Sequence, residues 1–254
     1  MHANSLSPNA ARTDGFLRQA LYVLPLLVLM AWAAEASGLD GWLERRYFDA
    51  AMQAFPLRNN LLFSVVLHDG LRMLMVAVLL LLLLLLLVAR LLPEAVGRHL
   101  PPFWRQPRLL PYLATVFAAG PALVGLLKQV TTRSCPWSLL QYGGSLPYDA
   151  KPFFSLAAAG HCFPGAHATT GLVLFAFVPL LPARRRWLAA LLVFVAGMAL
   201  GWVQIMRGAH FLSHNLWSSA IGWSVMLLAW QLIRPGYQPL PAQAWREAVE
   251  SQPT

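Results

Sequence analysis

Three short segments place histidine, arginine or lysine at the edge of a long apolar stretch: Lys128–Pro136, Phe163–Thr169 and Gln204–Asn215. A neutral imidazole can attack phosphorus or carry a proton, and lysine and arginine bind phosphate oxygens. Cations are costly beside a bilayer, so their concentration there indicates a site for an anionic group. Together the segments predict phosphate-ester chemistry at a membrane surface.

The third segment carries the strongest nucleophile candidate. His210 and His214 are four residues apart, and Arg207 precedes His210 by three, so a continuing helix would place them on one face. A nucleophilic His210 needs a partner at its far ring nitrogen to fix the tautomer. Two other interpretations stay open, because the pair also suits metal ligands or histidines that face lipid headgroups.

The other two segments supply a proton donor and positive charge. Pro164 and Gly165 form a turn, and Ala166 begins a helix whose N-terminal backbone N–H groups can hold a phosphate. His167 in its first turn can protonate a leaving group. Lys128 and Arg133 bring fixed positive charge: lysine acts as a point charge, and the arginine guanidinium can donate two parallel hydrogen bonds to one phosphate. The alternative is an incidental histidine and cations that anchor helices to headgroups.

The composition places these segments in a membrane protein. Of the 254 residues 58% are apolar and 11% charged, against about 25% charged in soluble domains. The net charge of +9 does not indicate nucleic acid as a partner, because the arginines are dispersed between apolar runs rather than gathered on one face. We expect one integral membrane domain covering residues 1–254, with the lipid bilayer as its surroundings.

The apolar segments predict an all-α bundle of six transmembrane helices, each close to the length that crosses a hydrocarbon core. The predicted spans are residues 16–36, 71–92, 111–129, 166–181, 187–206 and 216–233. Leu39–Leu57 has helix-period aromatics and mixed charge, which favours an interfacial amphipathic helix. A long, turn-rich outer loop should join the third and fourth helices.

Arginines in alternate connections set the expected orientation. The basic positions are Arg12, Arg18, Arg90, Arg98, Arg105, Arg108, Arg184, Arg185, Arg186, Arg234 and Arg246. The positive-inside rule places them, and both termini, in the cytoplasm. All three histidine- or lysine-bearing segments then face outward, to the periplasm if the protein lies in a bacterial inner membrane.

Cys135 and Cys162 lie in the same outer region. In an oxidising compartment they could form a disulfide, and they could equally be small buried apolar residues.

Taken together, the segments resemble the type 2 phosphatidic acid phosphatase superfamily, whose motifs are K-x6-R-P, P-S-G-H and S-R-x5-H-x3-D. Lys128 with Pro136 matches the first motif, Pro164 with His167 the second, and His210 takes the place of the nucleophile in the third. The resemblance implies six helices, a phospho-histidine on His210 and no metal cofactor. It implies a membrane lipid phosphate as substrate.

Two family arginines are displaced in this chain. Cys135 stands where the first motif has arginine, and Arg133 lies two residues earlier. Gln204 stands where the third motif has arginine, and Arg207 follows three residues later. Because an arginine lies near each lost one, we interpret the pattern as a rearranged site in an active enzyme.

Two further departures concern the histidine network. Gly165 lacks the serine hydroxyl of the second motif, and His214 replaces the aspartate that should orient His210. The orienting partner could therefore be the carbonyl of Asn215, neutral His214 or a carboxylate elsewhere, of which Asp69 is the best placed.

The resulting hypothesis is a lipid phosphatase. His210 attacks phosphorus, His167 protonates the leaving group and later activates water, and the substrate's oxygens are held by Lys128, Arg133 and Arg207. The resemblance suggests undecaprenyl pyrophosphate, phosphatidylglycerol phosphate or lipid A as substrates.

Three alternative functions stay open: a phosphotransferase between lipids, a non-catalytic lipid-binding protein, and a metal or haem protein using His161, His167, His210 and His214. The oligomeric state is left open.

Overall fold

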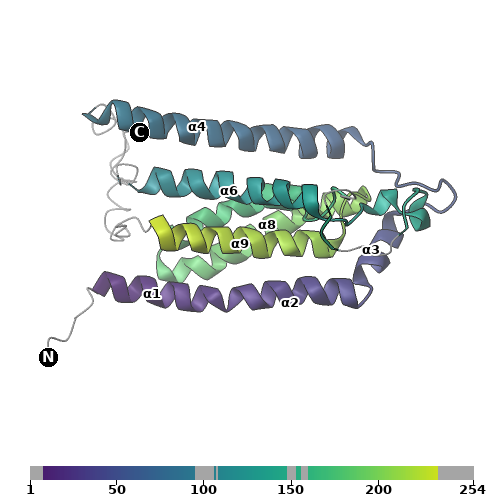
Figure 1. Ribbon diagram of the computed structural model, residues 1–254, viewed down its shortest axis with the longest axis horizontal. Helices are drawn as coiled ribbons and strands as arrows, with labels where there is room; N and C mark the ends of the chain where they lie inside the picture. The colour runs from purple at the N-terminus through teal and green to yellow at the C-terminus, as the bar shows by residue number, and fades with distance from the viewer. Residues whose placement is uncertain (1–7, 95–105, 107, 148–152, 156–159, 234–254) are drawn as a thin grey trace, which may run out of the picture.

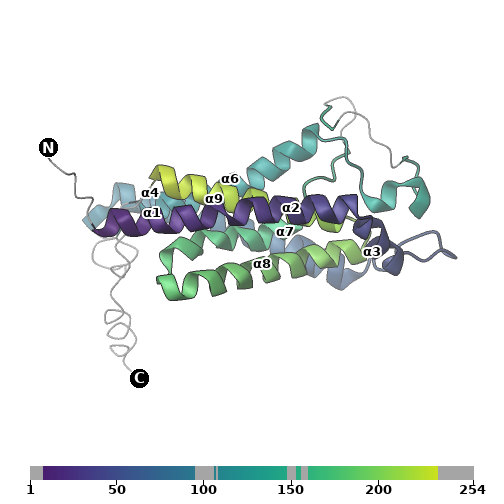
Figure 2. The same cartoon turned by 90° about the horizontal axis from the view of Figure 1, so that it is seen from below.

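The computed structural model describes residues 8–94, 106, 108–147, 153–155 and 160–233, with side chains placed from residue 15 onward. This part of the chain is helical, apart from isolated β-bridges in the loops. The long helices lie side by side along one axis (Figure 1). α3 lies at one end of the bundle, and α1 begins at the other. Figure 2 shows the loops after α6 at the same end as α3.

The longest separations between consecutive described helices are those before α6 and before α7. The α-helices are α1 Pro8–Leu21, α2 Val23–Ala36, α3 Leu39–Tyr47, α4 Leu71–Leu91, α6 Leu109–Val130, α7 Ala166–Leu172, α8 Ala183–Met206 and α9 Leu212–Ile233. A π-helix, η1 Leu62–Gly70, runs directly into α4. The 3-10 helices are η3 Pro136–Ser138, η4 Leu140–Tyr142 and η5 Val173–Leu180.

Five helical segments in the described residues are long and apolar enough to cross a membrane: Gly15–Ala36, Leu62–Leu91, Leu109–Val130, Ala183–Met206 and Leu212–Ile233. The predicted fourth span is a shorter apolar segment, Ala166–Leu180, in which α7 runs into the 3-10 helix η5. At about 1.5 Å per α residue and 2.0 Å per 3-10 residue, that segment is about 27 Å long. Five of the six predicted spans therefore correspond to helices long enough to cross a membrane, and the fourth corresponds to this shorter segment.

The observed helices differ from the predicted spans in their boundaries, and the fifth and sixth each begin four residues earlier, at Ala183 and Leu212. The first is divided at Tyr22, because the ring of Pro25 cannot donate a hydrogen bond and crowds the preceding turn. The second begins at Leu62 rather than at residue 71, which places His68 and Asp69 inside a helix instead of before it.

The core lies between α9, α6 and the α7–η5 segment. The Trp223 ring packs edge-on against Phe175 at 5.0 Å between centroids, and its indole N–H donates to the carbonyl of Ala20 over 2.9 Å. The Tyr112 hydroxyl donates to the carbonyl of Ala176 over 2.9 Å. These two bonds satisfy buried polar groups while joining α1, α6, η5 and α9.

The predicted amphipathic helix over Leu39–Leu57 is wrong in its extent. Its helix, α3, ends at Tyr47, because the Asp49 carboxylate accepts the N–H groups of Ala51 and Met52 and turns the chain back. Its charges also do not all face water: Asp40 and Glu44 of α3 are buried.

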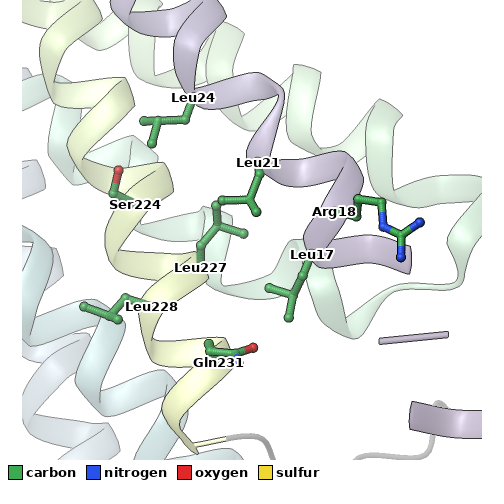
Figure 3. A pocket seen from close by; sticks show the side chains of 8 residues that line it. All are labelled: Leu17, Arg18, Leu21, Leu24, Ser224, Leu227, Leu228 and Gln231. Carbon is green, nitrogen blue, oxygen red and sulfur yellow. The ribbon is translucent and has the colours of Figure 1, made fainter. Parts of the chain in front are cut away.

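A cavity lies between the α1–α2 segment and α9, away from the histidines (Figure 3). It has a volume of about 670 Å³ and an apolar wall that includes Leu21, Leu24 and Leu227. Arg18 and Gln231 are the polar residues toward its far end, near the end of α9. No catalytic group of the site described below lines it.

Candidate active site

The turn between α8 and α9 presents His210. The N–H of Gly208 donates to the carbonyl of Ile205, and that of Ala209 to Gln204, each over 2.8 Å, in the pattern of a Schellman motif. Gly208 has a φ of +69°, and the Phe55 ring occupies the place where a Cβ would stand. The glycine therefore ends α8 sharply and leaves His210 in a fixed connection to α9.

Asp40 fixes the other side of this connection. Its carboxylate accepts the backbone N–H of Ser213 over 2.9 Å and the Ser213 hydroxyl over 2.5 Å. An acceptor at the first turn of α9 satisfies an N–H group that has no partner inside the helix. Burial raises the pKa of the Asp40 carboxyl, and the hydrogen bonds from Ser213 oppose that effect.

Three histidines gather at this end of the bundle. The ring centroids of His167 and His210 are 6.5 Å apart, and those of His210 and His214 are 5.9 Å apart. Burial is the main cause that lowers the pKa of His210 well below 6.5, and the nearby charge of Lys128 adds to it. His210 is therefore neutral near pH 7, which is the state that can attack an electrophile.

Arg207 and Gln204 form a pair beside the histidines. The Arg207 Nε donates to the carbonyl of Arg58 and its NH1 to the Gln204 side-chain oxygen, each over 3.1 Å. Gln204 is buried and stands where the family motif has arginine. The glutamine thus holds the displaced guanidinium in place without cancelling its charge.

Arg133 is already engaged in an ion pair. Its guanidinium lies 2.6 Å from the Glu35 carboxylate, and it also lies over the Phe153 ring at 5.3 Å. Both members of the ion pair are partly exposed. A role for Arg133 in holding phosphate stays a prediction, and it would require the guanidinium to share or exchange Glu35.

Gly165 is explained by the neighbouring helix. The Asn215 side chain occupies the place where a Cβ on Gly165 would stand, so the serine of the family motif does not fit here. The Gly165 N–H donates to the carbonyl of His214 over 3.0 Å. That donor, expected to hold phosphate, is therefore already used, whereas Ala166 begins α7 as predicted.

Asp69 contacts a different histidine from the expected one. Its Oδ1 lies 2.7 Å from Nδ1 of His68, and the His68 ring stacks on His167 with centroids 3.9 Å apart. Asp69 therefore lies on the His167 side of the site, and its contact with the histidines runs through His68 to His167 rather than to His210. The sequence singled out the His68–Asp69 pair but not this stacking.

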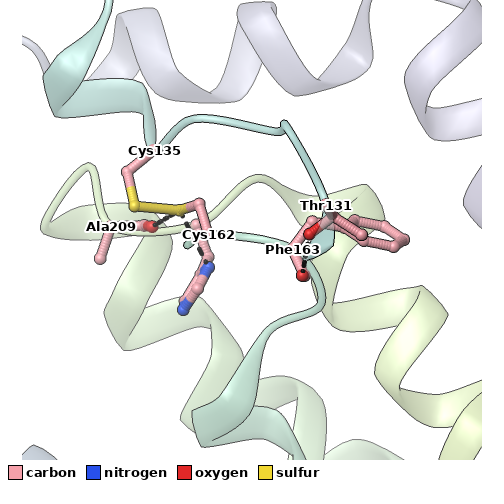
Figure 4. The surroundings of a disulfide bond; sticks show 6 residues. Thr131, Cys135, Cys162, Phe163 and Ala209 are labelled. Atoms are coloured by element: carbon pink, nitrogen blue, oxygen red, sulfur yellow. Dashed lines mark hydrogen bonds between the residues drawn. A yellow bond between two sulfur atoms is a disulfide. The ribbon is translucent and has the colours of Figure 1, made fainter. Parts of the chain in front are cut away.

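The far nitrogen of His210 instead faces a disulfide. Cys135 and Cys162 are bonded, which settles the question that the sequence left open, and Sγ of Cys162 lies 3.4 Å from Nδ1 of His210. Figure 4 shows the disulfide beside Ala209 and the hydrogen bond from Thr131 to the carbonyl of Phe163. The only sequence signal for this contact was the presence of both cysteines next to the histidine-bearing segments.

A second cavity, of about 430 Å³, lies between α4, α6 and α7 and has His167 in its wall. The wall is mostly apolar, and its charged or titratable residues are Arg72 and His167. The other lining residues come from α4, α6 and α7: Met75, Val76, Leu79, Phe117, Ala118, Pro121, Ala122, Ala166 and Thr170. Arg72 lies outside the three predicted segments, so no motif pointed to it.

Comparison with known families identifies the chain. Residues 109–236, which include α6 to α9 and all three predicted segments, match the family model of the PAP2 superfamily. The chain therefore belongs to the PAP2 superfamily, whose members are generally phosphatases. No significant match was found among curated proteins or solved structures.

Proposed function

We propose that this protein is a membrane lipid phosphatase that works through a phospho-histidine on His210. The observation that carries the proposal is the pair of imidazoles, His167 and His210, 6.5 Å apart beside Lys128 in a chain of the PAP2 superfamily. One ring can attack a phosphorus atom while the other reaches its leaving oxygen. The burial of His210 keeps it neutral for that attack.

The proposed reaction has two steps. The His210 nitrogen forms a bond to phosphorus as the bond to the leaving oxygen breaks, and His167 gives that oxygen a proton. His167 then takes a proton from water, whose oxygen displaces His210 and releases phosphate. Nδ1 of His167 is buried and has no hydrogen-bond partner among the described residues, so no group there competes for it. Lys128 and Arg207 stabilise the charge that develops on the phosphoryl oxygens.

A lipid substrate is supported by the cavity between α4, α6 and α7. Its mostly apolar wall suits a hydrocarbon chain, while Arg72 and His167 in the same wall suit a phosphate. The substrates we propose are lipid phosphates or pyrophosphates of the undecaprenyl pyrophosphate, phosphatidylglycerol phosphate or lipid A class.

An outward-facing site in a bacterial inner membrane is part of the proposal. The disulfide at the histidine end is typical of an oxidising compartment. Arg184, Arg185 and Arg186 begin α8, 24 residues long, at the opposite end from His210, as the positive-inside rule requires. Four of the arginines behind that prediction lie outside the described residues: Arg98, Arg105, Arg234 and Arg246.

Phosphate release from a panel of lipid phosphates tests the proposal. Purified protein in detergent with EDTA should release phosphate from at least one lipid, and His210→Ala should lower the rate by at least about 10³-fold. His161→Asn is the matched control, because His161 is exposed at a φ of +54° that asparagine tolerates. Full activity in His210→Ala would show that another group is the nucleophile. A labelled donor with an acceptor lipid separates hydrolysis from phosphotransfer.

A further inference from the structure

The groups expected to orient His210 are engaged elsewhere or make no hydrogen bond to it. Asp69 bonds to His68. Nδ1 of His214 and the Asn215 side-chain amide have no hydrogen-bond partner among the described residues. The neighbour that the structure gives to Nδ1 of His210 is the sulfur of Cys162, at 3.4 Å.

A disulfide sulfur has no hydrogen and can only accept a hydrogen bond. The contact therefore selects the tautomer in which Nδ1 of His210 carries the proton and Nε2 carries the lone pair. This is the orienting effect that a carboxylate would have, but it comes from a group that does not titrate. The other ring nitrogen, Nε2, is then the atom available for attack.

The sulfur is held firmly in this position. Cys162 is completely buried, and its Sγ also contacts the Ala209 carbonyl oxygen at 2.8 Å. The Cys162 N–H donates to the carbonyl of Arg133 over 3.3 Å. Next to it, Thr131 anchors the carbonyl of Phe163 over 2.7 Å. A rigid acceptor limits rotation of the imidazole.

The same place contains the donors of a metal site. Donor atoms of Cys162, His210 and His214 all lie within 4.8 Å of one another, and all three residues are buried. One thiolate and two imidazoles form a ligand set typical of zinc with an open fourth position. In the disulfide the sulfur is not a thiolate, so the set is incomplete as long as the bond is intact.

We propose that the Cys135–Cys162 disulfide is the positioning group for His210, and that opening it creates a zinc site from Cys162, His210 and His214. This inference rests on the proposed function for the role of His210, whereas the zinc site stands on geometry alone. Bound zinc would occupy the nucleophile, so the reduced protein is inhibited by a metal to which the oxidised protein does not respond.

The opening reaction requires a dithiol reductant. Its thiolate attacks Sγ of Cys135, which is less buried than Cys162, and Cys162 leaves as a thiolate beside His210. The second thiol of the reductant then displaces Cys135, which leaves as a second thiolate, and the reductant becomes a cyclic disulfide. The two electrons thus pass from the dithiol to the two cysteine sulfurs.

Zinc binding by cysteine variants tests the metal site without an activity assay. Cys135→Ser frees Cys162 and should bind one zinc ion per chain in metal analysis, whereas oxidised wild type and Cys135→Ser/Cys162→Ser should bind none. In the Cys135→Ser background, His214→Asn should abolish binding, and the control His161→Asn should preserve it. Equal binding by the single and double cysteine variants would overturn the site. Wild type reduced with a dithiol provides the same measurement if Cys135→Ser does not fold.

Phosphate release and the position of the phosphoryl group test the positioning role. Cys135→Ala/Cys162→Ala should lower kcat about 10- to 100-fold with KM unchanged, as for loss of other orienting partners. Phosphorus NMR of trapped enzyme should show phosphate only on Nε2 in wild type and on both nitrogens in the variant. Wild-type kcat with Nε2 alone in the double variant overturns the positioning role. An inactive wild type would instead count against the proposed function, and the zinc result would stand.

Discussion

α4 and α9 are both long and apolar enough to span a membrane, but they occupy opposite environments. The most apolar window of the segment that includes α4 is 6% buried inside the protein, whereas that of α9 is 56% buried. α4 carries the leucine run, while α9 carries His214, Asn215 and several serines. In this molecule the more polar helix is therefore the more buried one.

The physical reason is that lipid offers no hydrogen-bond partners, whereas neighbouring helices do. Ser218 donates from its hydroxyl to the carbonyls of Gly165 and His214, each over 2.9 Å, and Ser219 donates to Asn215 over 3.2 Å. Small residues such as Gly222 also let α9 approach α7 closely. A helix in the middle of the bundle can carry polar side chains because its neighbours supply hydrogen-bond partners, and a helix that faces lipid cannot.

The largest expected effect is a difference in unfolding free energy between substitutions in α9 and in α4. Trp223→Ala in α9 should lower the free energy of unfolding by about 3–5 kcal/mol, because it leaves a cavity and the Ala20 carbonyl unpartnered. Leu81→Ala in α4, where the side chain is 54% exposed, should change it by less than about 0.5 kcal/mol. Reversible unfolding in mixed micelles measures both, and similar losses would show that α4 is packed inside the protein or an oligomer.

The next effect concerns the contact between α7 and α9. Gly165→Ser restores the residue of the family motif but places its Cβ on the Asn215 side chain, so it should destabilise the protein. Adding Asn215→Ala removes the obstacle, and the two changes should couple by about 0.5–3 kcal/mol in a double-mutant cycle. Additive effects in the same unfolding assay would mean that the helices shift apart at no cost.

A pH effect is expected where α3 packs against α9. Burial is the main cause that raises the pKa of Glu44 well above 4.5, and the Asp40 charge adds to it. The folded protein then holds this proton more tightly than the unfolded chain. Stability is therefore greatest below about pH 4.5 and falls as the pH rises toward the folded pKa, by up to about 1.4 kcal/mol per pH unit.

Glu44→Gln is the measurement that isolates this effect. The variant should remove this component of the pH dependence. At pH values above the folded pKa of Glu44 it should also have a higher melting temperature than wild type, because a neutral amide replaces a buried carboxylate. Both carboxylate oxygens of Glu44 are without a hydrogen-bond partner among the described residues. A melting temperature that depends on pH in the same way in Glu44→Gln and wild type would show that Glu44 stays ionised in the folded protein.

The smallest expected effect concerns the edge of the site. The Arg133–Glu35 ion pair is partly exposed, so Glu35→Gln should cost about 0.2–1 kcal/mol of stability. If the freed Arg133 binds substrate phosphate, the same variant should lower KM, and Arg133→Gln should raise it. Unchanged KM in both variants would restrict Arg133 to joining the outer loop to α2.

Several features of the molecule were predictable from the chain alone. Apolar length predicted the helices, because hydropathy and rise per residue are local properties. Since Lys128, His167 and His210 all lie at equivalent ends of such helices, the sequence also predicted that they would gather. The family motifs added the order of these residues and the phosphatase class.

Only the tertiary structure decided which side chains meet across helices. Asp69 contacts His68, and the Asn215 side chain occupies the place where a Cβ on Gly165 would stand. Nδ1 of His210 faces Cys162. These pairings depend on how each helix is rotated about its axis and on how closely its neighbours approach. Spacing along one chain does not encode rotation between helices, so the packed bundle alone determined what surrounds His210.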